Sequence, residues 1–233
     1  MELLTMLILS VVLILILIVL LGFNTKNIKI IKQIGESKEL NNITDVLPEN
    51  EQICKDILKM LNNEDVNIKQ GSENSKSSLY IVATNSILIA NIKSTFTRVQ
   101  TIAHECIHSV QDKRLLWFNF IFSNIYLLYF AITFVLSVFN KLSMVNMFAI
   151  ILIMMSFLLY FVRSYLEIDA MTKARYLAKE YMEDNKDLIS QRDIDTVIEN
   201  YNKLNKVGVK FYCFNLIFKY LIKIIIFCVA AIL

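Results

Sequence analysis

The chain has 233 residues, of which 56% are hydrophobic, and its mean hydropathy is +0.52. A soluble domain contains about 45–50% apolar residues, so this composition argues against a wholly soluble protein and excludes a disordered or collagen-like chain. The formal net charge of +3 is too small to indicate a nucleic-acid partner.

The cysteines show no CxxC or other metal-binding spacing. Two of them lie in an apolar C-terminal run, and we expect the cysteines to be small buried apolar residues rather than metal ligands. They are Cys54, Cys106, Cys213 and Cys228.

Four apolar runs are long enough to cross a bilayer core, which needs about 20 apolar residues. We interpret the first as a retained anchor rather than a cleaved signal peptide. No Lys or Arg precedes it, it is too long, and no small-x-small cleavage site follows it. The predicted transmembrane segments are residues 1–23, 115–139, 142–162 and 211–233.

The second and third runs are separated by little more than Asn140 and Lys141, so they predict a tight helical hairpin over residues 115–162. The polar segments 24–114 and 163–210 then share one side of the membrane. They hold 12 and 9 of the 24 Lys and Arg residues, and the positive-inside bias makes that side cytoplasmic. We expect a multi-pass protein of the cell membrane with both termini outside.

Two charged residues, Lys219 and Lys223, stand one turn apart in the fourth run. We expect them to snorkel toward the cytoplasmic headgroups. A functional intramembrane pair is the alternative.

The first polar segment has the pattern of a small α+β domain. Residues 24–43 indicate a linker or a helix leaving the membrane, and Pro48 begins a helix. A short strand is expected at residues 66–69, and the β-branched runs 79–83 and 87–92 indicate a hairpin. The expected buried face of the Pro48 helix is Ile53, Ile57, Leu58 and Leu61.

The next predicted helix is capped by Ser94 or Thr95 and runs to about Asp112. Its apolar residues recur at helical spacing, which indicates an amphipathic helix on a core rather than a membrane span. We expect Glu105 on the opposite, polar face together with both histidines of the chain.

The second polar segment is expected to form two helices, at residues 163–183 and 193–206, the latter ended by Gly208. The predicted fold class is therefore an α+β membrane protein. About four transmembrane helices carry one small domain that is assembled from residues 24–114 and 163–210.

The two histidines lie in the sequence His104-Glu105-Cys106-Ile107-His108. Residues i and i+4 project from one face of a helix, so both imidazoles can reach one metal ion. Zinc suits imidazole, and a catalytic zinc site uses three protein ligands and one water. Glu105 is placed to accept a proton from that water. A pair of solvated surface histidines is the alternative.

The third ligand cannot be histidine, because the chain has no other. A carboxylate from another element on the same side of the membrane is required, and we assign Glu167, which closely follows the hairpin. Asp112 and Asp169 are its rivals. The predicted ligands of one Zn²⁺ ion per chain are His104, His108 and Glu167.

The segments HECIHSVQ and EIDAMTKA resemble motifs of the neutral zinc metallopeptidases of the bacterial membrane (YugP-like), whose pattern is HEvGHAiQ followed by EfnASrRA. The resemblance covers roughly residues 79–180 and, outside the two motifs, is one of arrangement. Besides the HExxH residues, the matching positions are Gln111, Glu167, Ala170, Lys173 and Ala174.

This resemblance implies a zincin-like, minimal gluzincin domain with a short β-sheet and an HExxH helix. It implies the same three metal ligands, with Glu105 as general base. Two positions depart from the family pattern: Ile107 stands for its Gly, and Met171 stands for a Ser or Asp that commonly contacts a ligand histidine. Asp169 lies about 200° round the helix from Glu167 and is poorly placed to substitute, so that contact stays unassigned.

The sequence favours a membrane-anchored zinc metalloendopeptidase that acts on peptides or membrane-protein segments at the cytoplasmic face. In zincins a strand beside the active helix pairs with extended substrate, and we assign this role to residues 87–92. Candidates for stabilising an oxyanion are Tyr165, Tyr176, Arg175 and Arg98, each of which also fits a surface or packing role.

A zinc-binding or regulatory membrane protein that lacks turnover is the main alternative, and the departures at Ile107 and Met171 favour it. A small transporter or bacteriocin-immunity-type protein has little support, because only two charges lie within the runs. An intramembrane peptidase conflicts with the polar residues around the motif. The expected partners are a peptide or protein substrate and the lipid bilayer, with no nucleic acid.

Overall fold

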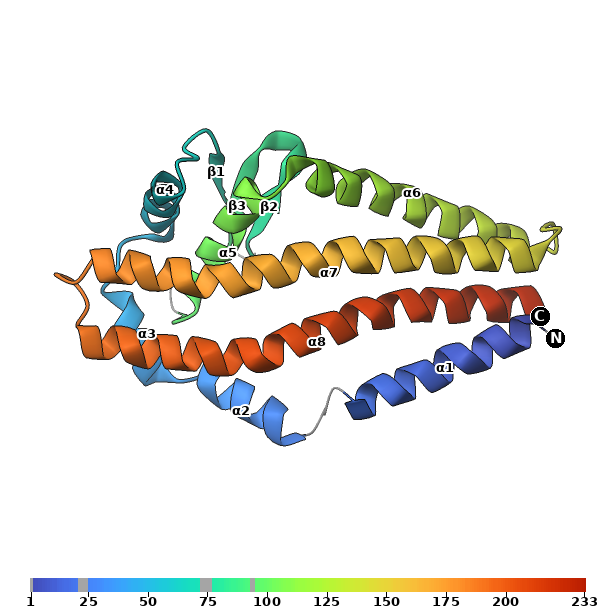
Figure 1. The fold of residues 1–233 in the computed structure, drawn as a ribbon, viewed down its shortest axis with the longest axis horizontal. Helices are drawn as coiled ribbons and strands as arrows, with labels where there is room; N and C mark the ends of the chain where they lie inside the picture. Colours follow the sequence, from blue (N-terminus) through green and yellow to red (C-terminus); the bar gives the residue numbers. More distant parts are fainter. Residues whose placement is uncertain (1, 21–24, 72–76, 93–94) are drawn as a thin grey trace. The chain divides into compact units, whose positions relative to one another are not determined.

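The computed structural model describes residues 2–20, 25–71, 77–92 and 95–233. These residues are mostly helical and include a three-stranded sheet (Figure 1). The chain divides into two units. The apolar unit comprises residues 1–24, 118–165 and 210–233, and the mixed unit comprises residues 25–117 and 166–209.

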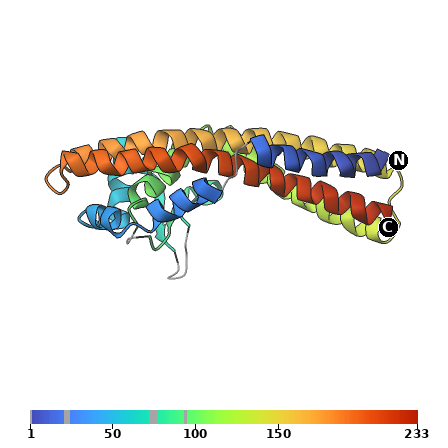
Figure 2. The same ribbon diagram turned by 90° about the horizontal axis from the view of Figure 1, so that it is seen from below.

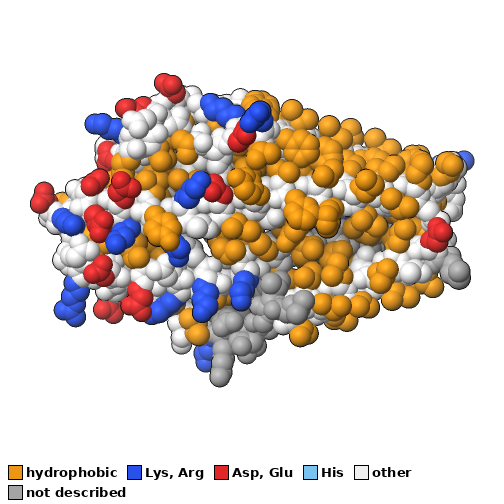
Figure 3. All heavy atoms as spheres, in the orientation of Figure 1, with side chains coloured by type: hydrophobic (Ala, Val, Ile, Leu, Met, Phe, Trp, Pro, Cys, Tyr) orange, Lys and Arg blue, Asp and Glu red, His pale blue; other side chains and the backbone are white. Residues whose placement is uncertain are grey.

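Among the described residues, four helices are long and apolar enough to cross a membrane, as the sequence predicted. Their apolar surface is largely open: 6% of the apolar window of the first helix is buried and 33% of that of the last. Apolar side chains cover this surface in Figure 3. Such a surface suits lipid rather than water. The four helices are α1 (Glu2–Leu20), α6 (Lys113–Val138), α7 (Val145–Asp184) and α8 (Gln191–Ile232).

The core of the apolar unit is formed by α6, α7 and α8, with apolar side chains of α1 packed against it. Figure 2 shows the ribbons of these four helices running alongside one another. Polar groups are few here, and Tyr126 is a buried example whose hydroxyl accepts a hydrogen bond from Ser156 Oγ at 3.0 Å. The turn between α6 and α7 contains Asn140 and Met144 at positive φ. The predicted hairpin therefore turns within these few residues.

Two predicted helix breaks are wrong. The third apolar run and the helix expected after it form the single helix α7, and α8 continues through Gly208. Glycine weakens a helix by about 1 kcal/mol relative to alanine, but it ends one only in a left-handed cap conformation. A Cβ at Gly208 would lie 3.5 Å from Met171 Cε, in ordinary contact, so α7 and α8 pack closely at this point of the mixed unit.

The mixed unit begins with three helices. The segment predicted as a linker or a helix is helical: it forms α2 (Thr25–Gly35) and α3 (Lys38–Asp45), apart from residue 24, which lies outside the described residues. Ser37 caps α3 by accepting a hydrogen bond from the Leu40 amide. The helix predicted after Pro48 is α4 (Asn50–Met60). It buries three of the four residues expected on its inner face, whereas Leu61 is half-buried.

The sheet has the order β1-β3-β2. Strands β2 (Leu79–Ile81) and β3 (Ser86–Ile89) form the predicted hairpin, joined by the 3₁₀ turn η1 (Val82–Thr84) and by Asn85 at φ 44°. Strand β1 (Asn67–Gln70) pairs with β3 in parallel. Strand β3 is therefore the central strand and is paired on both sides.

Helix α5 (Arg98–Val110) carries the histidines and is shorter than predicted. Ser94 lies outside the described residues, and Thr95 Oγ1 donates to the Ile92 carbonyl within a turn, so neither residue is shown to cap the helix. The expected polar face is also wrong in part, because Glu105 and His108 are buried.

The cysteine prediction is confirmed for three residues, since Cys54, Cys106 and Cys228 are buried, while Cys213 is half-buried. Cys54 of α4 and Cys106 of α5 are in contact, with their sulfur atoms 3.7 Å apart.

Candidate metal centre

The first turn of α5 is held by the buried side chain of Arg98. Its Nη1 donates to the Pro48 carbonyl at 2.8 Å, and its Nη2 donates to the carbonyls of Thr44 and Leu47 at 2.7 and 2.8 Å. The Asn50 side chain accepts a further hydrogen bond at 3.0 Å. A buried guanidinium needs such partners to offset its lost hydration. These contacts tie the start of α5 to the chain between α3 and α4.

The last turn of α5 is anchored separately. Asn63 Nδ2 donates to Ser109 Oγ at 2.8 Å and to the Ser109 carbonyl at 3.3 Å. Because both ends of α5 are bound to the segment around α4, the histidines between them have a defined position.

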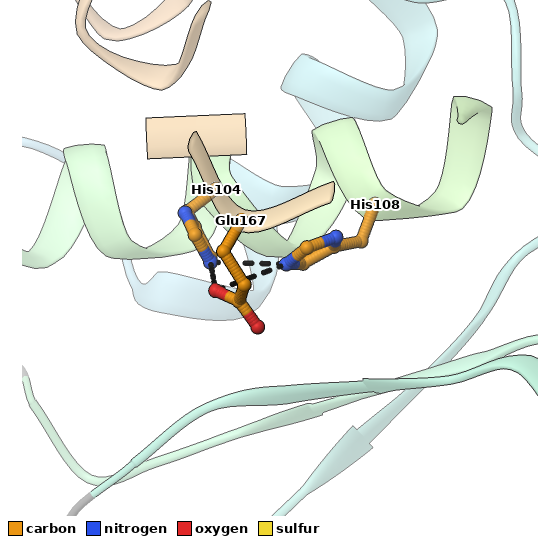
Figure 4. A group of neighbouring side chains, drawn as sticks. All are labelled: His104, His108 and Glu167. Atoms are coloured by element: carbon orange, nitrogen blue, oxygen red, sulfur yellow. Dashed lines mark hydrogen bonds and ion pairs between the residues drawn. The ribbon is translucent and has the colours of Figure 1, made fainter. Parts of the chain in front are cut away.

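Three predicted side chains converge on one point of the mixed unit: His104 and His108 of α5 and Glu167 of α7 (Figure 4). The two Nε2 atoms are 3.0 Å apart. Glu167 Oε2 lies 3.3 Å from His104 Nε2 and 3.8 Å from His108 Nε2. The two imidazole rings are perpendicular.

These spacings fit one shared metal ion. Nitrogen and oxygen ligands lie about 2.0–2.1 Å from a tetrahedral zinc ion, so two such ligands are about 3.3 Å apart. The three observed distances, 3.0, 3.3 and 3.8 Å, bracket that value. The side chains are 19%, 11% and 22% exposed for His104, His108 and Glu167, so the group is sheltered but reachable. It could therefore hold a metal ion.

His108 is oriented by Gln111, which follows it by three residues. The Gln111 Oε1 atom lies 2.8 Å from His108 Nδ1. Its Nε2 donates to the Leu166 carbonyl at 2.7 Å and to Asp169 Oδ2 at 2.9 Å. Because the amide nitrogen of Gln111 is the donor in both of these bonds, its Oε1 accepts a hydrogen bond from His108 Nδ1–H. His108 Nε2 then carries a lone pair that is available to a metal. Gln111 thus fixes the tautomer and links α5 to α7.

The rival ligands are engaged elsewhere. Asp169 binds Gln111 and forms an ion pair with Lys173 at 2.7 Å, while Asp112 forms a bidentate pair with Arg114. The expectation that Asp169 cannot contact a ligand histidine directly agrees with this geometry, but Asp169 acts on His108 through Gln111. Met171, the departing position, packs against α8 instead.

Glu105 is buried and turned toward the sheet. Its Oε2 accepts a hydrogen bond from the Tyr80 backbone amide of β2 at 2.6 Å. Burial raises the pKa of Glu105 above its ordinary value, and the charges of His104 and His108 and the Tyr80 hydrogen bond partly offset this rise. The carboxyl group is therefore fixed by backbone and lies within electrostatic reach of both histidines.

Charge is strongly coupled within the three-residue group. Burial would raise the pKa of Glu167, but the hydrogen bonds and charges of His104 and His108 outweigh it and hold the pKa well below its ordinary value. Burial would lower the pKa of His108, yet its hydrogen bonds to Glu167 and Gln111 raise the pKa. Glu167 thus remains a carboxylate that attracts positive charge to this point.

The structure bears on two of the substrate contacts considered above, and Arg98 has the packing role that was its alternative. Strand β3 has both backbone edges paired, so it cannot add an extended substrate strand. Arg98 is fully buried against carbonyl groups and cannot reach an oxyanion. Arg175 is half-buried and donates hydrogen bonds to Tyr176 and Asn202, while Tyr176 and Tyr165 are exposed to solvent.

Sequence reasoning missed the Tyr80 amide and the bridging role of Gln111. The role of Gln111 could have been found, since this residue lies three residues after His108 and therefore on the same helix face. The Tyr80 contact could not, because a backbone amide carries no sequence signature.

Comparison of the chain with protein-family models, with curated proteins and with solved structures finds no match.

Proposed function

We propose that this protein is a membrane-anchored zinc metallopeptidase, with His104, His108 and Glu167 as ligands and Glu105 as general base. The observation that carries the proposal is the spacing of the three ligand atoms, which lie within 4.8 Å of one another. The resemblance to the YugP-like peptidases agrees with the same assignment.

Zinc is the metal that this donor set fits best. Two neutral imidazoles and one carboxylate form a common catalytic zinc site, in which the fourth position is left to water. When bound there, zinc would lower the pKa of that water and polarise a substrate carbonyl. Gln111 supports the choice, because an imidazole oriented through its second nitrogen is a typical zinc ligand.

Glu105 would move the proton. Its position directly after His104 places it beside the ligand group, and the Tyr80 amide holds one of its carboxylate oxygens. The other oxygen would accept a proton from the attacking water and deliver it to the leaving amine. A buried carboxylate suits both steps, since it exchanges protons more readily near neutral pH than an exposed one.

We further propose that the site faces the cytoplasm at the membrane and cleaves peptides or membrane-protein segments. The support is the sequence: 21 of the 24 Lys and Arg residues lie in the two polar segments, and such segments stay on the cytoplasmic side. A maleimide reagent that does not cross membranes should label a cysteine placed at Lys141 from outside. Labelling only after the membrane is opened would reverse this orientation.

The peptidase assignment is tested by two substitutions that separate metal binding from turnover. In Glu105→Gln, the purified protein should retain about one zinc per chain by elemental analysis but produce no new peptide termini from a denatured membrane-protein mixture. In Glu167→Ala, zinc itself should be lost, because two histidines alone bind weakly. Glu180→Gln, an exposed position on the same helix, is the matched control and should resemble the wild type.

Two results would contradict the proposal. Cleavage that survives Glu105→Gln would remove Glu105 as the base. A wild-type protein that holds zinc but generates no new termini would favour the non-catalytic zinc-binding alternative.

A further inference from the structure

A cluster of positive charge lies in the apolar unit. It consists of Arg163 near the end of the apolar stretch of α7 and of Lys219 and Lys223 on α8. The two lysines are four residues apart and therefore on one helix face, separated by about 6 Å along the axis.

Lys223 is half-buried, and its ammonium group lies over aromatic rings. Its Nζ is 4.8 Å from the centre of the Tyr126 ring and 5.9 Å from that of Phe130. Among the described residues, no carboxylate lies within ion-pair distance of this ammonium group, and the charges that act on it are those of Lys219 and Arg163. Cation–π contact compensates only part of the lost hydration.

A series of contacts connects two of the cations. The Arg163 guanidinium donates a hydrogen bond to the Tyr220 hydroxyl. The Tyr220 ring meets the Tyr126 ring edge-on, with centroids 5.5 Å apart, and Lys223 lies over the same Tyr126 ring. Arg163 and Lys223 therefore contact the same pair of tyrosines, and the charge of Lys219 acts on Lys223 from one turn earlier in α8.

Snorkelling accounts for part of this arrangement. Lys219 is exposed and can extend along the helix toward headgroups. Lys223 lies one turn deeper and is held against aromatic faces, so its position is fixed by the bundle. Three like charges that repel one another in an apolar bundle are stabilised by an anion, and the phosphate of a lipid is the anion that a membrane supplies.

We propose that Arg163, Lys219 and Lys223 form a binding site for the phosphate group of an anionic phospholipid such as phosphatidylglycerol. Tyr220 and Tyr126 provide the apolar and hydrogen-bonding wall of this site. The proposal needs the four apolar helices to cross a membrane, but it does not depend on metal binding or peptidase activity. Basic pockets between transmembrane helices on the cytoplasmic side are the usual sites for such headgroups.

The test is a lipid titration of the purified full-length protein in a neutral detergent, with bound lipids counted by native mass spectrometry. Phosphatidylglycerol should bind at least tenfold more tightly than phosphatidylcholine. Because each basic residue near a headgroup contributes roughly a fivefold factor, Lys223→Met and Lys219→Met should each weaken phosphatidylglycerol binding about fivefold. Lys141→Met, which removes an exposed lysine of the α6–α7 turn, is the matched control and should change nothing.

Further measurements distinguish a lipid phosphate from a free anion, and the loss of a binding site from a folding defect. Inorganic phosphate and glycerol phosphate should bind far more weakly than the lipid, because the acyl chains supply the affinity. Lys223→Arg keeps the positive charge and should therefore retain the preference for phosphatidylglycerol. If Lys223→Met weakened binding only by disturbing the packing of the helices, the arginine variant would not be expected to retain that preference. The proposal fails if the double variant Lys219→Met/Lys223→Met binds phosphatidylglycerol like the wild type, or if free phosphate binds as tightly as the lipid.

Discussion

The two units use buried polar side chains in different ways. In the mixed unit, Arg98 and Gln111 connect segments that are about fifty residues apart in the sequence. In the apolar unit, the hydroxyls of Ser10, Thr133 and Ser164 return to the carbonyl four residues earlier in their own helix. Polar contacts therefore specify the tertiary structure around the histidines, whereas the apolar helices are held together mainly by apolar packing, with few hydrogen bonds between helices such as that from Ser156 to Tyr126.

The largest effect expected from this difference concerns Arg98. Arg98→Met removes a buried donor group from the carbonyls of Pro48 and Leu47, whereas the Thr44 carbonyl keeps the Leu47 amide as a donor. Each unsatisfied buried carbonyl costs roughly 1–3 kcal/mol, so we expect a loss of about 3 kcal/mol or more, measured by chemical unfolding in detergent. The same change in the apolar unit, Lys223→Met, should not destabilise the protein in neutral lipid. Equal losses in both variants would contradict the comparison.

The sequence predicted which three side chains come together better than it predicted their supports. HExxH identifies His104 and His108, because residue spacing on a helix is a local property, and the need for a carboxylate on the same membrane side identifies Glu167. The burial of Glu105 could not be predicted this way, since it depends on where β2 lies. Gln111 could be placed on the correct face, but its link to Leu166 depends on the packing of α7 against α5.

The helix boundaries show the same limit. Hydropathy identifies where an apolar stretch ends, at Arg163 for example, but a helix continues as long as its backbone hydrogen bonds do. The change from apolar to polar residues within α7 and α8 was therefore wrongly interpreted as the end of a helix. The order of the strands could not be predicted either, because no local sequence pattern indicates the parallel pairing of β1 with β3.

The next expected effect concerns Gln111 and metal affinity. Gln111→Leu removes the acceptor at His108 Nδ1 and frees the ring to rotate or change tautomer. Loss of such a partner typically weakens metal binding 10–100-fold, which competition with a chromophoric zinc chelator would measure. Gln100→Leu, which breaks a hydrogen bond from α5 to Asn205, is a matched control and should leave zinc affinity within a few-fold of the wild type.

Gln111 also allows a distinction between structure and tautomer control. Gln111→Glu retains an acceptor for His108 Nδ1 but loses the donor to Leu166 and faces Asp169. If the tautomer is what matters, this variant should bind zinc more tightly than Gln111→Leu. Weaker or equal binding would mean that Gln111 acts chiefly by joining α5 to α7.

The smallest expected effect comes from one substitution made in both units. Ser109→Ala removes the hydroxyl that accepts from Asn63 across the mixed unit, whereas Ser10→Ala removes a hydroxyl bonded only within α1. A lost cross-link between segments costs about 1 kcal/mol, while a Ser hydroxyl bonded to its own helix contributes little or slightly weakens it. Amide hydrogen exchange should therefore accelerate about fivefold in α5 for Ser109→Ala and stay unchanged in α1 for Ser10→Ala. Equal acceleration would mean that hydroxyl hydrogen bonds within a helix stabilise the apolar unit as much as hydrogen bonds between segments stabilise the surroundings of the histidines. The two units would then differ only in their surfaces.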